Sequence, residues 1–366
     1  MRKVKVLMGI IGKGNGGLSM YMVNLFKKLD RDVFDCTFLS NAQNPYFEKD
    51  ILDLGGKIEF ITPRNRHPKQ HRDELRKIMK EGNFDVCHIH LSSDSNIVPL
   101  VEAKKANIPL VISHCHSSKV EGSLYPKILH ILNKPKLKKL DNIKLCCSQK
   151  SGEFAYGNAD FKVINNGIDV NRFEFNATTR QKLRQELGIT DCFVIGQIGR
   201  LVPVKNHIFT IEVFSEILKE CPESRLLIVG DGPLESEIIN KAKECSVADK
   251  VIFTGNVRNP EDYFSAIDCM MLPSFFEGFP LTVVEAICSG LYSFVSDNVT
   301  PEIKISELVE FINLNGDKKE IAKTVLKSKD KERTSQACKL RELGYDADEL
   351  IKDMQKLYLS SVTGGN

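Results

Sequence analysis

The sequence predicts an α/β protein made of two doubly wound, Rossmann-like domains. At 366 residues the chain is longer than one ordinary hydrophobic core supports, so two domains are expected. Short β-rich runs alternate with helical patterns, which is typical of βαβ units around a parallel sheet. The alternation restarts after a turn-rich segment near Asn166, so the boundary is expected between about Asn165 and Asp191.

A first strand is expected in residues 1–10, because their apolar part is too short for a signal sequence and runs into a glycine loop. After it the pattern predicts helices over 18–29, 73–81 and 97–106, and strands over 36–39, 86–90 and 110–113. The second domain is expected to hold strands over 193–199, 225–230, 251–254 and 269–272, and helices over 207–220 and 234–245. A last helical pattern covers 347–359. Ligands of such sheets bind beyond the carboxyl ends of the strands, so the expected site is the cleft between the domains.

The composition is that of a soluble globular protein, with 42% hydrophobic and 27% charged residues. No apolar run approaches the roughly 20 residues that span a bilayer. Eleven cysteines, an odd number spread over expected strands and helices, favour a reducing compartment, and a cytoplasmic protein is expected. The net charge of +3 is too small to indicate a nucleic-acid partner, and no aromatic-basic binding module is visible.

The most informative stretch, residues 274–286, holds two glutamates, Glu277 and Glu285. The strand over 269–272 leads into a loop, and Pro280 lies where the first turn of a helix tolerates proline. The free N–H groups of that helix start favour an anion, and carboxylates accept hydrogen bonds from hydroxyl groups. A phosphate ligand that carries hydroxyl-rich groups is a nucleotide sugar, so this stretch predicts a nucleotide-sugar site.

The segment from Glu277 to Glu285 resembles the E-x7-E signature of the retaining GT-B glycosyltransferases, specifically glycosyltransferase family 4. Three further segments, 12–17, 165–169 and 199–206, fall in that family's order and spacing. The resemblance covers nearly the whole chain and implies the GT-B fold, in which the two domains face a central cleft. It implies that residues 1–165 bind the acceptor, that residues 166–345 bind the nucleotide sugar, and that the helix within 346–366 crosses back onto the first domain.

The resemblance also assigns site residues. It places Glu277 on the hydroxyls of the transferred sugar and Glu285 on the nucleotide ribose. It implies a histidine near the O6 region of the sugar, for which His116 fits best and His114 stays the alternative. The remaining donor-binding positions that it implies are Gly16, Gly17, Val257, Arg258, Gly278, Phe279, Pro280 and Leu281, with Val257 and Arg258 at the base-binding edge.

Arg200 and Lys205 follow the first strand of the second domain. A solvated charge pair is the ordinary explanation for such residues. Beside the two glutamates a catalytic role is favoured, since cleavage of the bond to a nucleoside diphosphate develops negative charge that a fixed Arg and Lys would stabilise. The two cations would stand in for a metal, so no metal and no cofactor are expected besides the nucleoside diphosphate sugar.

The glycine loop at 12–17 satisfies the G-x-G-x-x-G pattern of dinucleotide-binding folds. That interpretation needs an acidic residue at the end of the second strand, where the chain has Ser40 and Asn41. The glycines either form only a tight turn or let the backbone approach a ligand. The resemblance favours contact of Gly16 and Gly17 with the donor diphosphate or the acceptor.

Four of the eight histidines lie at two strand ends: His88, His90, His114 and His116. A zinc site with Cys87 or Cys115 added is conceivable. The alternation of side chains along a strand puts cysteine and histidine on opposite faces, so a metal is not expected.

A lysine-rich segment, residues 119–144, contains seven lysines interleaved with apolar residues. A solvated helix face is the ordinary explanation. A basic stretch with an apolar stripe also suits an anionic membrane surface, and residues 64–72 add positive charge to the same domain. The segment is therefore a candidate membrane surface.

These observations predict a metal-independent, retaining hexosyltransferase that moves a hexose from a UDP-sugar to a growing, lipid-linked glycan. Residues 297–302 resemble the bacterial capsular and exopolysaccharide branch of the family, which indicates surface polysaccharide biosynthesis. A peripheral place at the inner face of the membrane is expected. Two alternatives remain: a UDP-sugar 2-epimerase, against which the E-x7-E segment speaks, and a non-catalytic nucleotide-sugar-binding protein.

Overall fold

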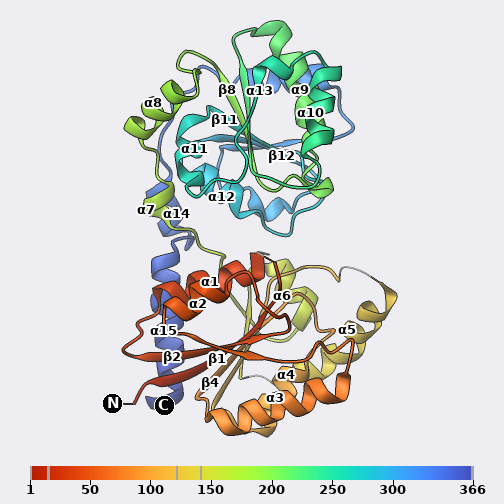
Figure 1. The fold of residues 1–366 in the computed structure, drawn as a ribbon, viewed down its shortest axis with the longest axis vertical. Helices are drawn as coiled ribbons and strands as arrows, with labels where there is room; N and C mark the ends of the chain where they lie inside the picture. The colour runs from red at the N-terminus through yellow and green to blue at the C-terminus, as the bar shows by residue number, and fades with distance from the viewer. Residues whose placement is uncertain (1, 15–16, 121–122, 141, 364–366) are drawn as a thin grey trace. The chain divides into compact units, whose positions relative to one another are not determined.

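The computed structural model describes residues 2–14, 17–120, 123–140 and 142–363. The chain divides into two compact units, one of Met1–Asn166 with Asp348–Asn366 and one of Gly167–Ala347. Each unit is built around one parallel sheet with helices on its faces (Figure 1). The predicted fold class, two doubly wound α/β domains, is confirmed.

The sheet of the first unit has seven strands in the order β3-β2-β1-β4-β5-β6-β7. The chain adds strands outward from β1 to β3 on one side of the sheet, and outward from β4 to β7 on the other. The carboxyl ends of β1 and β4 therefore form the switch point at which such sheets bind ligands. The strands are β1 Val4–Ile11, β2 Phe34–Ser40, β3 Lys57–Phe60, β4 Val86–Leu91, β5 Leu110–Cys115, β6 Ile143–Cys146 and β7 Lys162–Val163. The helices are α1 Gly17–Lys28, α2 Glu48–Asp53, α3 Pro68–Gly82, α4 Val98–Lys105, α5 Leu124–Leu137, α6 Gln149–Tyr156 and α15 Ala347–Thr363.

Side chains of β4 alternate between two hydrophobic cores, one on each face of this sheet. Val86 belongs to the core formed with α1 and α15, whereas Cys87 and Ile89 belong to the core formed with α3 and α4. Both faces of the sheet are therefore covered, as expected for a parallel sheet.

The C-terminal helix α15 packs on the first unit, although the chain that precedes it belongs to the second. Its residues Ile351, Met354 and Tyr358 are buried in the core that includes α1 and β1. Lys28 of α1 pairs with Asp348 at 2.5 Å, at the start of α15. Residues about 350 positions apart in sequence thus form one core.

The sheet of the second unit has six strands in the order β10-β9-β8-β11-β12-β13. They are β8 Val194–Ile198, β9 Arg225–Val229, β10 Val251–Phe253, β11 Cys269–Leu272, β12 Tyr292–Ser296 and β13 Val309–Ile312. The α-helices are α7 Val170–Phe173, α8 Ala177–Glu186, α9 His207–Glu220, α10 Glu235–Glu244, α11 Pro260–Ala266, α12 Leu281–Cys288, α13 Lys318–Leu326 and α14 Ala337–Glu342. Three short 3-10 helices join them: η1 Pro203–Lys205, η2 Ala248–Lys250 and η3 Pro301–Ile303.

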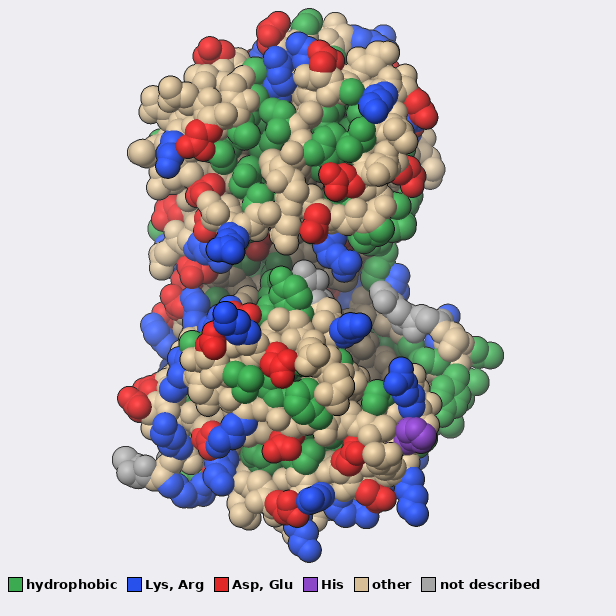
Figure 2. Space-filling view, viewed as in Figure 1, with side chains coloured by type: hydrophobic (Ala, Val, Ile, Leu, Met, Phe, Trp, Pro, Cys, Tyr) green, Lys and Arg blue, Asp and Glu red, His purple; other side chains and the backbone are tan. Residues whose placement is uncertain are grey.

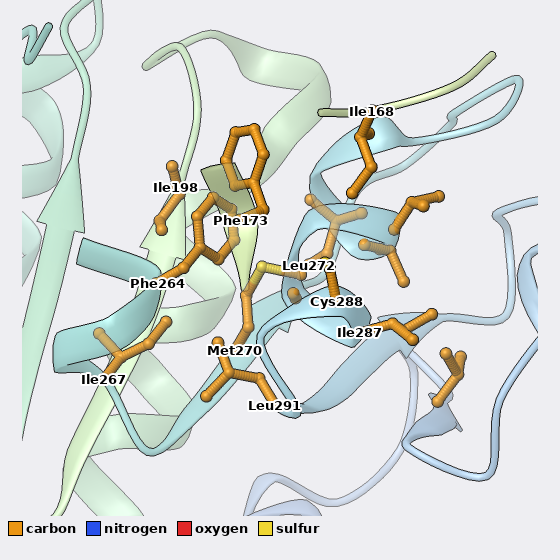
Figure 3. Close-up of a cluster of buried hydrophobic side chains, with 14 of the residues drawn as sticks. Ile168, Phe173, Ile198, Phe264, Ile267, Met270, Leu272, Ile287, Cys288 and Leu291 are labelled. Atoms are coloured by element: carbon orange, nitrogen blue, oxygen red, sulfur yellow. The ribbon is translucent and has the colours of Figure 1, made fainter. Parts of the chain in front are cut away.

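One of the two cores of this unit joins α7, α11 and α12 to β11 (Figure 3). Phe173 of α7 meets Phe264 of α11 edge to face, with ring centroids 5.6 Å apart. Met270, Leu272 and Cys288 are fully buried in the same core. The loop between β11 and α12 is therefore anchored at both ends by packed elements.

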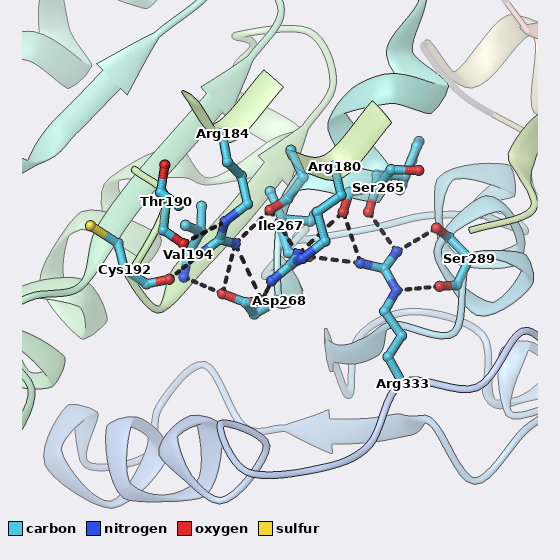
Figure 4. Close-up of polar contacts among 12 residues, drawn as sticks. Arg180, Arg184, Thr190, Cys192, Val194, Ser265, Ile267, Asp268, Ser289 and Arg333 are labelled. Atoms are coloured by element: carbon cyan, nitrogen blue, oxygen red, sulfur yellow. Dashed lines mark hydrogen bonds and ion pairs between the residues drawn. The ribbon is translucent and has the colours of Figure 1, made fainter. Parts of the chain in front are cut away.

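Three arginines converge on the segment that joins α11 to β11 (Figure 4). Arg180 and Arg184 of α8 pair with Asp268 at 2.5 and 3.2 Å. Arg333 donates to the carbonyls of Phe264 and Ile267 at 2.7 and 3.0 Å. Carbonyls at the end of a helix lack intrahelical partners, so these contacts satisfy groups that would otherwise be unpaired.

Candidate functional site

Lys205 and Glu277 form an ion pair beyond the carboxyl end of the second unit's sheet. Lys205 lies in η1, after β8, and Glu277 lies in the loop between β11 and α12. Lys205 Nζ is 2.7 Å from Glu277 Oε1, and the two side chains are 17% and 19% exposed. Ser274 Oγ donates to the same carboxylate oxygen at 3.1 Å. The cation and the carboxylate that the sequence singled out are thus in direct contact.

Two further hydrogen bonds hold this pair in position. Gln197 of β8 is 1% exposed and donates from Nε2 to the Lys205 carbonyl at 2.8 Å. The Phe275 N–H donates to the Val204 carbonyl at 2.9 Å. The first bond holds the segment after β8 to its own strand, and the second joins that segment to the loop after β11. The sequence analysis did not single out Gln197, because a polar residue within a strand gives no signal of its own.

Glu285 lies inside α12. Pro280 is the N-cap of this helix, so it precedes the first turn, in which the sequence had placed it. The predicted buried face of this helix is confirmed, since Val283, Val284, Ala286 and Ile287 are fully buried. Burial raises the pKa of the Glu285 carboxyl to about 7, although the positive charges of Arg172 and Lys205 lower it. The carboxyl can therefore change its charge close to neutral pH.

The turn before α12 leaves room for a ligand at one position. A Cβ at Gly278 would meet no atom within 4 Å. Phe279 stacks on Tyr345 with ring centroids 5.8 Å apart, while Pro280 is buried and Leu281 is half-buried. Gly278 is thus the open backbone position of this turn.

Arg200 follows β8 directly, but its side chain is exposed and pairs with no carboxylate among the residues that the structure describes. The backbone beside it is crowded. A Cβ at Gly230 would lie 2.2 Å from the Gly199 carbonyl oxygen, and Gly230 has a φ of 135°. Glycine at position 230 lets the ends of β8 and β9 approach closely. The structure does not bring Arg200 into the Lys205–Glu277 pair.

The expected base-binding edge, Val257 and Arg258, follows β10. Val257 is half-buried and Arg258 is exposed. Arg172 of α7 donates to the Arg258 carbonyl at 3.4 Å and pairs with Glu261 at 2.8 Å. The sequence analysis did not single out Arg172; its place three residues after the 165–169 segment is the only sequence feature that could have pointed to it.

Four histidines of the first unit gather at the ends of β4 and β5. His90 Nδ1 is 3.0 Å from His116 Nε2. His88 Nδ1 is 2.7 Å from the Tyr358 hydroxyl of α15. The rings of His88 and His114 are parallel, with centroids 5.4 Å apart. The histidines therefore form one connected cluster.

Burial lowers the pKa of all four imidazoles, to about 3 for His88 and His116. They are therefore neutral near pH 7. His116 is half-buried and its ring lies 4.8 Å from the ring of Tyr21, whereas His114 is fully buried. Of the two candidates for the sugar-binding histidine, His116 is the one that a ligand can reach.

Ring nitrogens of His88, His90 and His114 lie within 4.8 Å of one another. A tetrahedral ion with Zn–N bonds of about 2.1 Å would need these nitrogens roughly 3.4 Å apart, with rings that converge rather than stack. Cys87 and Cys115 belong to the core on the opposite face of the sheet. That cysteine and histidine face opposite ways is confirmed, and that no metal is held here stays a prediction.

The glycine loop leads straight into α1, which begins at Gly17. Gly16 lies outside the described residues. The Gly12 N–H donates to Ser19 Oγ of α1 at 3.4 Å. Contact of this loop with a ligand stays a prediction.

Helix α5 carries an exposed face of large apolar side chains in the lysine-rich segment. This α5 apolar face consists of Leu124, Tyr125, Ile128, Ile131 and Leu132, which are 45–71% exposed. Lys127, Lys136, Lys138 and Lys139 are exposed beside it. Figure 2 shows hydrophobic side chains gathered over the part of the first unit where Figure 1 places α5. Within the described ranges, no helix has both the length and the apolar character needed to cross a bilayer.

Comparison with known proteins matches both halves of the chain to family models. Residues 15–172 match the model described as Glycosyltransferase Family 4, and residues 179–342 match Glycosyl transferases group 1. The chain is 27% identical over 369 residues to EpsF of Bacillus subtilis, a protein named as a glycosyltransferase, covering 97% of this chain and 96% of that protein. It is 25% identical over 298 residues to the UDP-Gal:alpha-D-GlcNAc-diphosphoundecaprenol alpha-1,3-galactosyltransferase of Escherichia coli, covering 77% and 76% of the two chains.

Among solved structures, the Anabaena protein Alr3699/HepE in complex with UDP superposes with a TM-score of 0.81. The alignment covers 99% of this chain and 100% of that one at 20% identity. At that identity the match establishes the shared fold.

Proposed function

Because the chain belongs to glycosyltransferase family 4 and has the GT-B fold, we propose that it transfers a hexose from a UDP-sugar to a lipid-linked glycan, with retention of anomeric configuration. The product would serve capsular, exopolysaccharide or other surface polysaccharide biosynthesis. The observation that carries this proposal is the Lys205–Glu277 pair in front of the α12 N-terminus, with Glu285 inside that helix.

The second unit would bind the donor. The diphosphate would lie at the open Gly278 turn, where the free N–H groups of α12 favour an anion. Lys205, held by Gln197, would stabilise the negative charge that grows on the leaving diphosphate, together with the exposed side chain of Arg200. These cations would replace a metal ion in the transfer step.

The two glutamates would bind different parts of the donor. Glu277 lies in the loop next to Lys205, the cation proposed to bind the diphosphate, and would accept hydrogen bonds from hydroxyls of the transferred sugar. Glu285 lies in the second turn of α12 and would bind the ribose, beside the base edge formed by Val257 and Arg258. The pairing of Glu277 with Lys205 keeps the carboxylate oriented before the donor arrives.

The first unit, residues 1–165 with the C-terminal helix, would bind the acceptor. His116, which is the accessible member of the histidine cluster and is neutral near pH 7, would contact the sugar at its O6 region. The E. coli relative acts on a diphosphoundecaprenol-linked sugar according to its name, which supports a lipid-linked acceptor here.

A lipid-linked acceptor requires the enzyme to work at a membrane, and the α5 apolar face with its lysines suits that place. The five side chains of the α5 apolar face are exposed and do not pack into the core of the first unit, so they favour an apolar partner. The neighbouring lysines favour anionic lipid headgroups over a second protein core. The protein would thus be peripheral at the inner face of the membrane.

The test is a screen of nucleotide sugars, in which release of the nucleotide is measured with and without membrane extracts that hold acceptor lipids. The proposal expects slow hydrolysis of one UDP-sugar and faster turnover when acceptor is present. An epimerase would convert the donor to its epimer without acceptor. A binding protein would bind the donor and release no UDP under either condition.

A further inference from the structure

Arg172 connects three parts of the second unit that the proposed function places around the nucleotide. It lies in α7, which begins after Asp169; the Asp169 side chain accepts from the Arg172 N–H at 3.1 Å and caps the helix. The 165–169 segment, which the donor proposal above does not use, therefore sets the position of this arginine.

The guanidinium contacts the expected base-binding edge. Arg172 Nη2 pairs with Glu261 Oε2 of α11 at 2.8 Å and donates to the Arg258 carbonyl at 3.4 Å. An arginine that bridges a carboxylate and a carbonyl fixes both, because its N–H groups point in set directions. The loop after β10 is thus tied to α7 and to the start of α11.

The same charge acts on Glu285. Helix α7 packs against α12, and Cys288 Sγ of α12 donates to the Val170 carbonyl at 3.3 Å. Three charged groups face Glu285 from the surrounding elements: Arg172 from α7 and Lys205 from η1 favour its ionised form, and Glu261 from α11 opposes it. Of the two cations, Arg172 lowers the pKa of Glu285 more than Lys205 does.

We infer that Arg172 is a positioning residue for the nucleotide: it fixes the base-binding loop to α7 and α11, and it places a positive charge beside α12, the helix that carries Glu285. This inference rests on the donor site proposed above. A carboxylate accepts stronger hydrogen bonds than a neutral carboxylic acid, so the charge of Glu285 bears directly on nucleotide affinity.

The experiment is calorimetric titration of the full-length protein with UDP at pH values from 6 to 8.5. Wild type should bind more weakly as pH falls through about 7, where Glu285 takes up a proton. Arg172→Gln should shift that midpoint upward; a rise of one pH unit would weaken UDP binding about fivefold at pH 7, because about a tenth of the Glu285 carboxyl would then be ionised instead of half. Lys182→Gln, at a lysine of the same unit that is 77% exposed, is the matched control and should bind as wild type.

Two further variants separate charge from structure. Arg172→Lys keeps the positive charge but loses the paired contacts, so the pH midpoint should stay in place while affinity falls. In a Glu285→Gln background, Arg172→Gln should no longer shift the pH dependence, because the titrating group is gone. Thermal unfolding and circular dichroism of each variant check that it folds. If Arg172→Gln does not fold, the comparison is made with Arg172→Lys.

An unchanged midpoint and unchanged UDP affinity in folded Arg172→Gln would overturn the inference, as would a shift that persists in the Glu285→Gln background. The failure of the donor proposal looks different. In that case Glu285→Gln itself would bind UDP as tightly as wild type at every pH.

Discussion

At the scale of single residues, the structure separates what the chain pattern can predict from what it cannot. Glu277, Glu285 and Lys205 could be predicted because each sits in a short segment with a defined spacing after a strand. Gln197 and Arg172 could not, since their roles come from contacts across the fold, with the Lys205 carbonyl and with Glu261. Sequence spacing fixes local position, whereas these contacts depend on which strands become neighbours.

The division of labour between the two glutamates gives the first prediction. A carboxylate on the ribose contributes mostly uniform binding, so Glu285→Gln should raise the donor KM with a smaller effect on kcat. Glu277 would touch the ring that gains positive character, so Glu277→Gln should lower kcat strongly, on the order of 100-fold. Steady-state kinetics, together with binding of free UDP, measures both effects.

UDP affinity should fall for the Glu285 variant and barely change for the Glu277 variant. The opposite pattern, or wild-type kinetics in both, would show that this segment is not the donor site. Glu320→Gln is a suitable control of equal charge change, because this residue of α13 is 65% exposed and pairs with Lys323 of the same helix.

Arg200 and Lys205 differ in their surroundings, and the structure turns this difference into a prediction. Lys205 is mostly buried and paired, so Lys205→Ala removes a cation and also leaves Glu277 without its partner. We expect a loss in kcat of about 100-fold or more, with donor binding less affected. Arg200 is exposed, so Arg200→Ala should fold normally and lower kcat by a smaller factor.

Pre-steady-state turnover at saturating donor measures the chemical step for both variants. Lys219→Ala removes an exposed lysine of α9 from the same unit and serves as the control. Near-normal kcat in Lys205→Ala would remove this residue from the phosphate site.

At the scale of helices and strands, most of the elements that the sequence predicted lie within one or two residues of their bounds in the structure. The strand over 269–272 and the helix over 207–220 have the predicted bounds. Strands β3, β6, β7, β12 and β13 were not predicted. Of these, β3 and β7 are short strands at the two edges of the first sheet, and their residues are largely exposed. Without buried side chains, such edge strands lack the hydrophobic pattern that marks a strand.

Helix α5 shows a different limit of the sequence. The pattern of apolar residues between lysines predicted a stripe, but not whether that stripe faces the core or the solvent. In the structure His130 and Leu137 face inward, while the α5 apolar face stays exposed. The exposed direction is what turns a lysine-rich helix into a candidate membrane surface.

The α5 surface is tested with liposomes. Changing Lys136, Lys138 and Lys139 to Glu should abolish sedimentation with anionic liposomes, because each basic residue near the surface adds about 1 kcal/mol of attraction. Changing Ile131 and Leu132 to Ser should weaken sedimentation even at low salt, since insertion depends on apolar area. Hydrolysis of the donor in solution should stay intact in both variants.

Matched controls come from other helices of the same unit. Lys77 and Lys80 of α3 and Lys104 of α4 are exposed, and changing them to Glu gives the same change in net charge. Leu52→Ser, at a 51% exposed position of α2, is the control for the loss of an exposed apolar side chain outside α5. Equal sedimentation of wild type, the α5 variants and these controls would show that α5 is an ordinary solvated helix and not a membrane surface. Self-association without liposome binding would instead identify a second copy as the partner.

At the scale of the whole molecule, the sequence predicted two α/β domains because the strand and helix alternation restarts once. The return of α15 to the first unit came only from the family resemblance, since its own pattern is that of an ordinary amphipathic helix. The structure explains the return by burial: Ile351, Met354 and Tyr358 complete a core around α1 and β1. The local sequence of a helix does not indicate on which distant part of the chain it will pack.

The uneven distribution of histidines between the two units predicts different sensitivity to acid. Seven of the eight histidines lie in the first unit, and burial lowers the pKa of six of these, including the four of the cluster. A histidine whose pKa is lower when folded stabilises the fold fully above its unfolded pKa of about 6.5, and loses this contribution as pH falls. Each such group contributes a slope of about 1.4 kcal/mol per pH unit below 6.5.

With three buried imidazoles and the half-buried His116 in the cluster, a fall of one to two pH units approaches the roughly 5–15 kcal/mol that stabilises a domain, so the first unit should unfold between about pH 6 and 4.5. In the second unit His207 alone acts this way, and the raised pKa of Glu285 acts oppositely, because its protonation between about pH 7 and 4.5 stabilises the fold.

Hydrogen exchange of peptides from β4 and β5, against those from β8 and β11, follows each unit separately. The first set should lose protection at higher pH than the second. His114→Leu, which removes one proton-binding site from the cluster, should make the loss less steep, whereas His67→Gln outside the cluster should leave it unchanged. Simultaneous loss of protection in both units, with the same steepness in His114→Leu, would contradict an origin in the histidine cluster.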